Sequence, residues 1–393
     1  MRLAIVSSRF PDEPGEAFLS AELEALRPCV ERLAVLPALP GATAYHPYKG
    51  EVVRIPVAGA ATLVAAVRTF LRRPGRALAA LRDILFAPGR LAHRLKNLAI
   101  YPKGLAIGAV LARERFDHVH AYWLSAPATL AMVAARTAGI TWSATGHRWD
   151  IYDDNFLALK AKRATAIRTI SSQGKDAVCA RVAPLDRARI DVVPLGVTIP
   201  EAIAVPPPRE ELVVLCAAEL RPVKGHAILL DALARAREMG VPIRAVLAGI
   251  GPLEEEIRAQ IARLGLDRCV RLEGYVSHGA LLERIVRGEF DAVVLASIAQ
   301  GDLKEGIPVI LIEAMAAGVP VVATKSGAIP ELLEPSRGTV VPCGDAVALA
   351  NAFVELARDP TRGRSRSASA RAFVRERYDA RQTATALLEH IRR

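Results

Sequence analysis

Short apolar runs alternate with amphipathic segments along almost the whole chain of 393 residues. Apolar runs bounded by turn residues are typical of buried strands, and segments with helical periodicity between them are typical of helices. The alternation therefore predicts an α/β protein built from βαβ units with parallel sheets. The strands are expected at 3–7, 33–36, 52–55, 118–121, 140–144, 166–170 and 190–193, and again at 212–217, 243–248, 270–272, 292–295, 319–324 and 339–341.

The chain is longer than one hydrophobic core usually supports. A proline-rich join runs through residues 194–200 and continues at 206–208. Such joins are typical of linkers between domains. We therefore predict one domain at 1–198 and a second at 209–366.

Composition restricts the class of protein. Hydrophobic residues make up 52% of the chain, which excludes a disordered protein. The five cysteines are scattered and form no C-x-x-C pair, which indicates a reducing compartment and no zinc site. The first residues are typical of a strand rather than a signal peptide, and no apolar run approaches the ~18 residues of a membrane span. We expect a cytoplasmic protein, either free or peripheral on the inner face of the membrane.

The net charge of +11 is concentrated in one segment, residues 59–116, which holds eleven Lys or Arg and two acids, Asp83 and Glu114. Basic residues alternate there with apolar ones at helical spacing, and basic amphipathic helices suit an anionic lipid surface. The alternative is that these helices pack on the first sheet and present a solvated basic face. Nucleic acid is a weaker partner, because no aromatic platform accompanies the charge.

An apolar helix with a single carboxylate is predicted near residue 310. Pro308 is a suitable first helical residue and Gly318 a suitable stop, and between them only Glu313 is charged. A helix that is apolar all round is buried, so its carboxylate needs a designated partner. Glu305 stands just before the helix, where unpaired N–H groups favour anions. These features predict a ligand site with donors for a phosphate.

The continuous stretch from Glu305 to Thr324 resembles the signature of retaining glycosyltransferases of family 4. The resemblance implies the GT-B fold, with two Rossmann-like domains facing across a cleft and a last helix, here 367–393, that returns to the first domain. It also implies that Glu305 contacts the donor sugar and Glu313 the ribose. The donor-binding residues beside them would be Gly306, Ile307, Pro308 and Val309.

A second motif follows the first strand of the second half. Lys224 and Arg221 lie where open α/β sheets bind ligands, and both side chains suit phosphate oxygens. The stretch resembles the family's diphosphate clamp, although Glu219 stands where the family usually has Arg. Either Arg221 replaces that arginine, or Lys224 acts alone. Gly249 and Gly251 follow the next predicted strand. They resemble the family's G-x-G-P segment, which lines the nucleotide side of the cleft, although a structural turn is the plainer interpretation.

In the first half, His147 follows a strand in a glycine-containing turn. It resembles the family histidine near the donor sugar, and Asp150 belongs to a D-I-Y stretch found in exopolysaccharide-type members. Gly15 and Glu16 lie in a segment that resembles the opening of those enzymes, on a loop expected to face the acceptor, and Asp150 is expected on the same acceptor side. The resembling enzymes need no divalent metal, so no metal or other cofactor is expected.

The resemblance implies a retaining hexosyltransferase that moves sugar from a nucleotide-diphosphate sugar to a hydroxyl acceptor: a polysaccharide, a lipid-linked sugar or a metabolite. Two alternatives share the fold. One is a nucleotide-sugar 2-epimerase, and the other is an inactive protein that binds a membrane surface. The motifs name neither the base, the sugar nor the acceptor.

Overall fold

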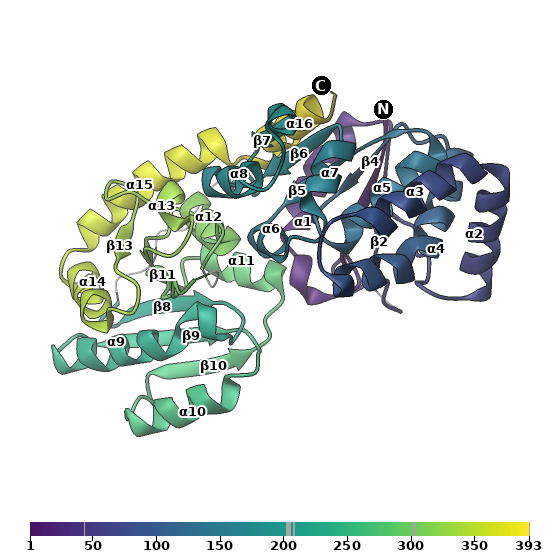
Figure 1. Ribbon diagram of the computed structural model, residues 1–393. Helices are drawn as coiled ribbons and strands as arrows, with labels where there is room; N and C mark the ends of the chain where they lie inside the picture. The colour runs from purple at the N-terminus through teal and green to yellow at the C-terminus, as the bar shows by residue number, and fades with distance from the viewer. Residues whose placement is uncertain (43, 202–205, 207–208, 302–303, 393) are drawn as a thin grey trace. The chain divides into compact units, whose positions relative to one another are not determined.

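The computed structural model describes residues 1–42, 44–201, 206, 209–301 and 304–392. The chain forms two compact units, one of Met1–Gly196 with Ala380–Arg393 and the other of Val197–Asp379. Figure 1 shows a sheet flanked by helices in each unit. Every strand pairing is parallel. The predicted fold class is therefore confirmed as two Rossmann-like domains.

The first unit holds a seven-stranded sheet in the order β3-β2-β1-β4-β5-β6-β7. Each strand overlaps the range predicted from its apolar run, although β3 is shorter than expected. The strands are β1 (Arg2–Ser7), β2 (Arg32–Pro37), β3 (Glu51–Val52), β4 (His118–Ala121), β5 (Thr141–Gly146), β6 (Ala166–Thr169) and β7 (Ile190–Val192).

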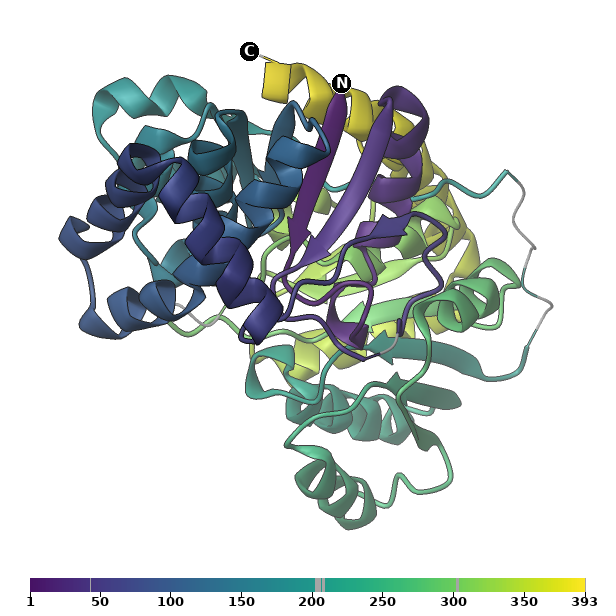
Figure 2. The ribbon, with the colours of Figure 1, turned by 90° about the vertical axis from the view of Figure 1, so that its right-hand side faces the viewer.

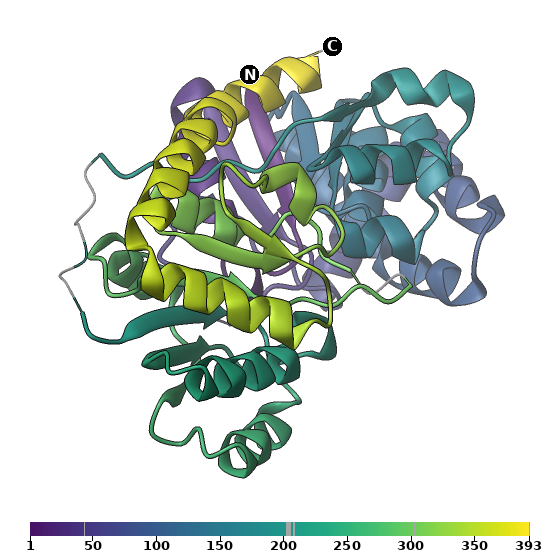
Figure 3. The same cartoon turned by 90° about the vertical axis from the view of Figure 1, so that its left-hand side faces the viewer.

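Alternate residues of β1 enter two separate cores, as the pleat of a strand requires. Leu3 and Ile5 pack with α1 (Leu19–Leu26) and α16 (Ala380–Arg392). Ala4 and Val6 belong to the core that contains α4 (Leu91–Arg113) and α5 (Ala126–Ala138). Figure 3 shows α16, in yellow, lying along the purple strands of the first sheet. The remaining helices of this unit are α2 (Ala60–Arg72), α3 (Pro74–Phe86), α6 (Arg148–Asp153), α7 (Leu157–Arg163) and α8 (Ser172–Cys179).

The second unit holds a six-stranded sheet in the order β10-β9-β8-β11-β12-β13. Its strands are β8 (Leu212–Ala217), β9 (Ile243–Ala248), β10 (Val270–Gly274), β11 (Ala292–Leu295), β12 (Val321–Thr324) and β13 (Thr339–Val341). Its helices are α9 (His226–Glu238), α10 (Glu254–Arg263), α11 (His278–Val286), α12 (Val309–Ala316), α13 (Ile329–Leu332), α14 (Ala346–Arg358) and α15 (Pro360–Arg377). All six strands lie where the sequence predicts them.

The unit boundaries differ from the expected 198, 209 and 367. Val197 already belongs to the second unit, because its side chain is buried in that core and its N–H donates to the Tyr378 carbonyl at 2.8 Å. Residues 367–379 also belong there, since Ala370 and Val374 on α15 are buried in the same core. The segment that returns to the first unit is therefore 380–393. Pro207 and Pro208 of the expected linker lie outside the described residues.

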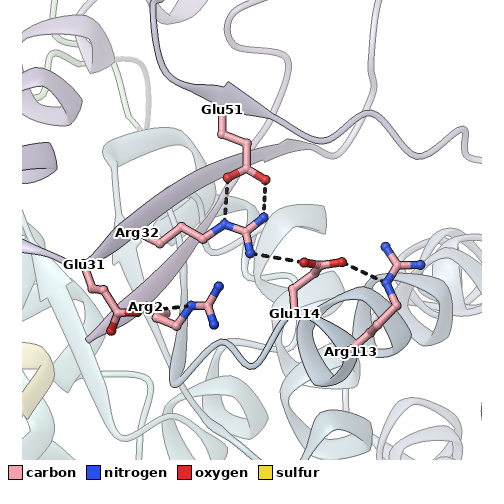
Figure 4. A network of polar contacts seen from close by, with 6 residues as sticks. All are labelled: Arg2, Glu31, Arg32, Glu51, Arg113 and Glu114. Atoms are coloured by element: carbon pink, nitrogen blue, oxygen red, sulfur yellow. Dashed lines mark hydrogen bonds and ion pairs between the residues drawn. The ribbon is translucent and has the colours of Figure 1, made fainter.

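A chain of ion pairs ties the amino end of the first sheet to the end of α4 (Figure 4). Arg32 grips Glu51 with two hydrogen bonds, of 2.6 and 2.8 Å, and reaches Glu114 at 3.2 Å. These carboxylates raise the pKa of the Arg32 guanidinium against a smaller effect of its desolvation. Arg113 also donates to Glu114, at 2.8 Å. The network therefore lies at the amino ends of the strands. Ligands usually bind at the opposite, carboxyl ends.

Among the helices that the structure describes, none combines the length and the apolar content needed to cross a bilayer.

Candidate functional site

Each sheet has one topological switch point, where the chain leaves two neighbouring strands in opposite directions. In the second unit it lies between β8 and β11, and in the first between β1 and β4. Open α/β sheets bind ligands at such points, beyond the carboxyl ends of the strands. Most of the predicted site residues lie on the segments that follow these strands or their immediate neighbours.

Lys224 and Glu305 meet at the switch point of the second unit. The Lys224 Nζ lies 2.7 Å from Glu305 Oε1, and the two side chains are 23% and 10% exposed. Ser297, which follows β11, donates its hydroxyl to the same carboxylate oxygen at 2.8 Å. The ammonium is therefore partly accessible and is held by a single carboxylate. An ammonium placed in this way can leave Glu305 and pair with an oxygen of an incoming phosphate.

Tight backbone packing holds Glu305 in place. Its N–H donates to Ser326 Oγ at 3.1 Å, and that hydroxyl donates to the Ile298 carbonyl at 2.6 Å. Gly327 adopts φ +53°, and a Cβ there would lie 1.9 Å from the Glu305 carbonyl oxygen. Only glycine fits both the angle and the contact. Gly225 plays the same part beside Lys224, because a Cβ there would lie 2.0 Å from the Ala296 carbonyl oxygen.

The loop after Glu305 leads into α12. The helix begins at Val309, and Pro308 is its N-cap with an extended backbone at φ −72° and ψ 120°, rather than the first helical residue that we predicted. Gly306, Pro308 and Val309 are partly exposed, whereas Ile307 is buried in the core. The first N–H groups of a helix have no partner within it, so this end of α12 supplies donors beside Lys224 and Glu305.

Glu313 has the designated partner that its position on an apolar helix requires. His278 Nε2 lies 2.7 Å from Glu313 Oε1, and Glu313 is buried while His278 is a quarter exposed. Burial of His278 opposes its protonation, but the hydrogen bond and the negative charge of Glu313 together raise the pKa of the imidazole. Sequence reasoning missed His278. The signal was its place directly after β10, at the start of α11.

Arg221 lies outside this cluster. Its Nε donates to Glu219 Oε2 at 2.5 Å, and both side chains are more than half exposed. Glu219 stands where the family usually has an arginine. It is the partner of Arg221, one of the two candidates to take over the role of that arginine. Of the two predicted clamp residues, Lys224 contacts Glu305 and Arg221 contacts Glu219.

Gly249 and Gly251 support the lysine loop through close packing. A Cβ on Gly249 would lie 2.0 Å from the Ala218 carbonyl oxygen, and a Cβ on Gly251 would lie 2.5 Å from the Leu220 carbonyl oxygen. Leu220 also donates its N–H to the Ile250 carbonyl at 3.0 Å. The two glycines thus let the turn after β9 press against the segment that leads to Lys224.

The predicted residues of the first unit gather around Trp123, which follows β4. Its indole N–H donates to Glu16, and its ring lies 4.3 Å from the His147 ring. Phe18 packs on the same imidazole at 5.5 Å. Burial, together with the positive charge of Arg168, lowers the pKa of His147 to about 3, so the ring is neutral. Trp123 was not singled out from the sequence, although its position after a central strand is a signal.

Glu16 and Asp150 bind backbone N–H groups. Glu16 is buried and accepts from Ser8 at 3.1 Å, Arg9 at 2.5 Å and Phe10 at 2.7 Å. Its neighbour Gly15 is exposed, and a Cβ there would touch nothing within 4 Å. The glutamate therefore holds the loop after β1, the loop predicted to face the acceptor, and Gly15 is not required for close backbone approach within the protein.

Asp150 is a buried helix cap. It accepts from the N–H of His147 at 2.7 Å and from that of Leu124. Burial raises the pKa of Asp150 to about 7, although these N–H groups and the charge of Lys160 oppose the rise. Burial likewise lowers the pKa of Lys160 to about 7, against the nearby carboxylates. Asp150 thus orients the turn that carries His147. Within the described residues, no group of three or more His, Cys, Asp or Glu is placed to hold a metal ion.

Comparison with known proteins finds a family model that is similar to most of the second unit. The model described as "Glycosyl transferases group 1" matches residues 200–373. The chain is 38% identical over 159 residues to WcaL of Escherichia coli K12, named as a candidate colanic acid biosynthesis glycosyltransferase. That match covers 39% of this chain and 38% of WcaL, so the chain spans well under half of that relative's length.

A longer match reaches into the first unit. The chain is 26% identical over 291 residues to a GDP-mannose-dependent alpha-(1-6)-phosphatidylinositol monomannoside mannosyltransferase of Mycolicibacterium smegmatis, covering 69% of this chain and 76% of that protein. Among solved structures, Anabaena HepE in complex with UDP-glucose is similar with a TM-score of 0.74 and 20% identity, covering 99% of this chain and 100% of that one. This likeness extends the shared fold over both units.

Proposed function

We propose that the protein is a glycosyltransferase of family 4, because residues 200–373 match the model described as "Glycosyl transferases group 1". It moves a hexose-type sugar from a nucleotide-diphosphate sugar to a hydroxyl acceptor and retains the anomeric configuration. The observation that carries the proposal is the Lys224–Glu305 ion pair at the switch point of that domain, next to the start of α12.

The leaving group of such a reaction is a nucleoside diphosphate, so charge develops on its phosphate oxygens. Preorganised donors aimed at that charge are usually the largest catalytic contribution. Lys224 exchanges Glu305 for a phosphate oxygen when the donor binds, and the first N–H groups of α12 add further hydrogen bonds. Released from the ammonium, Glu305 accepts hydrogen bonds from hydroxyls of the sugar. Arg221 is assigned only a peripheral role at the diphosphate, because it pairs with Glu219.

Glu313 holds the ribose of the donor. A carboxylate accepts up to about four hydrogen bonds, so the bond from His278 leaves capacity for the two ribose hydroxyls. His278 keeps the carboxylate oriented. It is a positioning residue rather than a catalytic one.

The transfer step follows from these roles. The bond between the anomeric carbon and the diphosphate oxygen breaks, and a bond from the acceptor oxygen forms on the same face of the sugar. The proton of the acceptor hydroxyl passes to the departing phosphate oxygen, so no protein carboxylate acts as nucleophile. We assign the neutral imidazole of His147 to the donor sugar from the family resemblance.

The names of similar proteins support two acceptor classes. Colanic acid is a polysaccharide, and the mycobacterial relative is named for a phosphatidylinositol mannoside, which is a lipid-linked sugar. Those names and the ligand of HepE also suggest the two donors to test first, GDP-mannose and UDP-glucose.

The test is donor turnover by the pure protein. It would be incubated with a panel of labelled UDP- and GDP-sugars, with and without short oligosaccharide and lipid-linked acceptors. Release of nucleoside diphosphate that Glu305→Gln abolishes supports the proposal, and the anomeric configuration of the product, read by NMR, tests retention. A new sugar formed without loss of nucleotide, or silence across the panel, would contradict it.

A further inference from the structure

Helix α2 presents four of its five large apolar side chains to solvent, and only Phe70 packs against the core of the unit. Its large exposed residues are Leu63, Val64, Val67 and Leu71, of which Leu71 is 72% exposed. The positions buried against the rest of the unit are instead small or polar: Thr62, Ala66 and Thr69. An ordinary surface helix has the reverse pattern, with its apolar stripe towards the core.

Helical geometry separates the two sets of residues. At 100° per residue, the four exposed apolar side chains fall within an arc of about 100°, and the buried positions lie on the far side of the helix. Arg68 and Arg72 are exposed and lie next to the apolar arc, both on its Val64 side. The helix is therefore amphipathic towards the outside of the unit.

The next two helices also expose apolar side chains. Leu78 and Leu85 of α3 are exposed, and Phe86 at its end is 79% exposed. Leu91 and Leu95 at the start of α4 are also exposed, at 63% and 59%. Because α2 and α3 pack on α4, the three helices lie together on one side of the first unit, as Figures 1 and 2 show. We call this surface, formed by the exposed side chains of residues 60–96, the outer helical face.

The charge of the outer helical face has a single sign. Its exposed cations are Arg68, Arg72, Arg76, Arg82, Arg90 and Lys96. The one acid in residues 60–96 is Asp83. Asp83 is buried and binds Arg136 and Arg163, the latter at 2.8 Å. No carboxylate of this segment therefore offsets the exposed cations.

We propose that the outer helical face docks on an anionic lipid bilayer. Exposed apolar side chains beside a row of cations are the pattern of helices that lie in a membrane interface, with the apolar residues among the acyl chains and the cations at the headgroups. The α2 helix has 13 residues, which suits a position in the plane of the membrane rather than across it.

Other occupants of the face fit less well. A second copy of the chain docked through the same face would bring cations against cations, because a two-fold interface pairs a patch with itself. A nucleic acid would match the charge but would leave the exposed leucines, valines and Phe86 without apolar partners. The bilayer satisfies both features. The proposal does not depend on the transferase activity.

The test is flotation of the full-length protein with vesicles. Binding is expected with vesicles of phosphatidylglycerol mixed with phosphatidylcholine, and little with phosphatidylcholine alone. Binding should weaken as salt shortens the Debye length from about 10 Å at 0.1 M to about 3 Å at 1 M. Equal binding to both vesicle types, or none to either, would overturn the proposal.

Variants locate the contact. We expect Arg68→Glu with Arg72→Glu, and separately Leu71→Ser with Phe86→Ser, each to lower the partition coefficient about tenfold or more. Val67→Ser has a matched control in Val347→Ser on α14, because the two valines are 57% and 52% exposed. Arg187→Glu, at an exposed arginine outside the face, controls for charge. Partition that the face variants leave at the wild-type value would overturn the proposal.

Two further measurements separate folding and self-association from lipid binding. Thermal unfolding of the face variants should match the wild type, since the altered side chains are exposed. Light scattering without vesicles should give one mass for all variants. A wild-type dimer that Leu71→Ser with Phe86→Ser converts to a monomer would assign the face to a second copy and contradict the bilayer. The face variants should release nucleoside diphosphate in solution at the wild-type rate. A loss of lipid binding can then be told apart from a loss of catalysis.

Discussion

Lys224 and Glu305 stand 81 residues apart in the sequence and 2.7 Å apart in the structure. Their contact joins the segment after β8 to the segment after β11, across the switch point of the second sheet. The two residues belong to separate motifs, each of which predicts a part of one donor site. Their contact orients the Lys224 ammonium against a carboxylate, and in the proposed function the ammonium exchanges that carboxylate for a phosphate oxygen.

Replacing Lys224 should impair chemistry more than folding. Lys224→Ala is expected to lower kcat about 10²–10³-fold, the size found when one preorganised donor to a developing charge is removed. Steady-state release of nucleoside diphosphate measures this. Arg221→Ala is the matched control, because Arg221 is exposed and bound to Glu219. A larger loss from Arg221→Ala than from Lys224→Ala would move the diphosphate clamp to the arginine.

Replacing Glu313 should weaken nucleotide binding. Glu313→Gln keeps the shape of the side chain and removes its charge. The hydrogen bonds from the ribose hydroxyls then go to a neutral amide oxygen and are weaker than those to a carboxylate. A loss of about 1.5–3 kcal/mol, or about 10–100-fold in Kd, is expected. Calorimetry with UDP and GDP measures the affinity. Unchanged affinity in a folded variant would remove Glu313 from the ribose site.

The His278–Glu313 pair should make stability depend on pH in one direction. The pKa of His278 is raised in the folded protein by its bond to Glu313, against the effect of burial. The proton is therefore held more tightly than in the unfolded chain, where the pKa is about 6.5. The stabilisation is complete below about pH 6.5 and is lost as the pH rises through the raised value.

The measurement is urea unfolding of the wild type and His278→Gln from pH 5.5 to 8.5. The difference in free energy of unfolding between the two proteins should be largest at the acid end and shrink towards the alkaline end. Subtracting the variant removes the contributions of the other histidines. A difference that grows with pH would contradict the assigned direction of the pKa shift.

Gly327 should tolerate no side chain. Gly327→Ala places a Cβ against the Glu305 carbonyl and adds the strain of a positive φ, so a loss of about 2–5 kcal/mol in the free energy of unfolding is expected. Gly344→Ala is the control, because Gly344 has φ +76° and nothing within 4 Å of its Cβ position. It should lose only the strain, about 1–2 kcal/mol. Equal losses in chemical unfolding would show that the contact with Glu305 costs nothing.

The architecture could be predicted because its signals are local. A parallel strand that is buried on both faces appears as an uninterrupted apolar run, and such runs as 212–217 and 292–295 coincide with β8 and β11. Because Lys224 and Glu305 follow the ends of predicted strands, their position at the carboxyl edge of the sheet could be predicted without knowing that they touch. The boundary at Val197 was not predictable in this way, because it depends on a bond from Val197 to Tyr378, far along the chain.

The finer site could not be predicted, because it depends on pairings between distant residues. Neither His278 nor Trp123 belongs to a motif in the sequence, and each gains its role from a partner that folding brings near. Asp150 and Glu16 were predicted on the acceptor-side loop, and their place opposite an acceptor stays a prediction. The structure shows instead which backbone N–H groups they hold.

The place of α16 has a consequence for how the protein is made. Leu387, Leu388 and Ile391 of α16 fill the core beneath Leu3 and Ile5, so two segments separated in sequence by the whole second unit share one hydrophobic interior. Until α16 has been synthesised, only α1 covers that side of the first sheet. Nascent chains should therefore bind chaperones until α16 has left the ribosome.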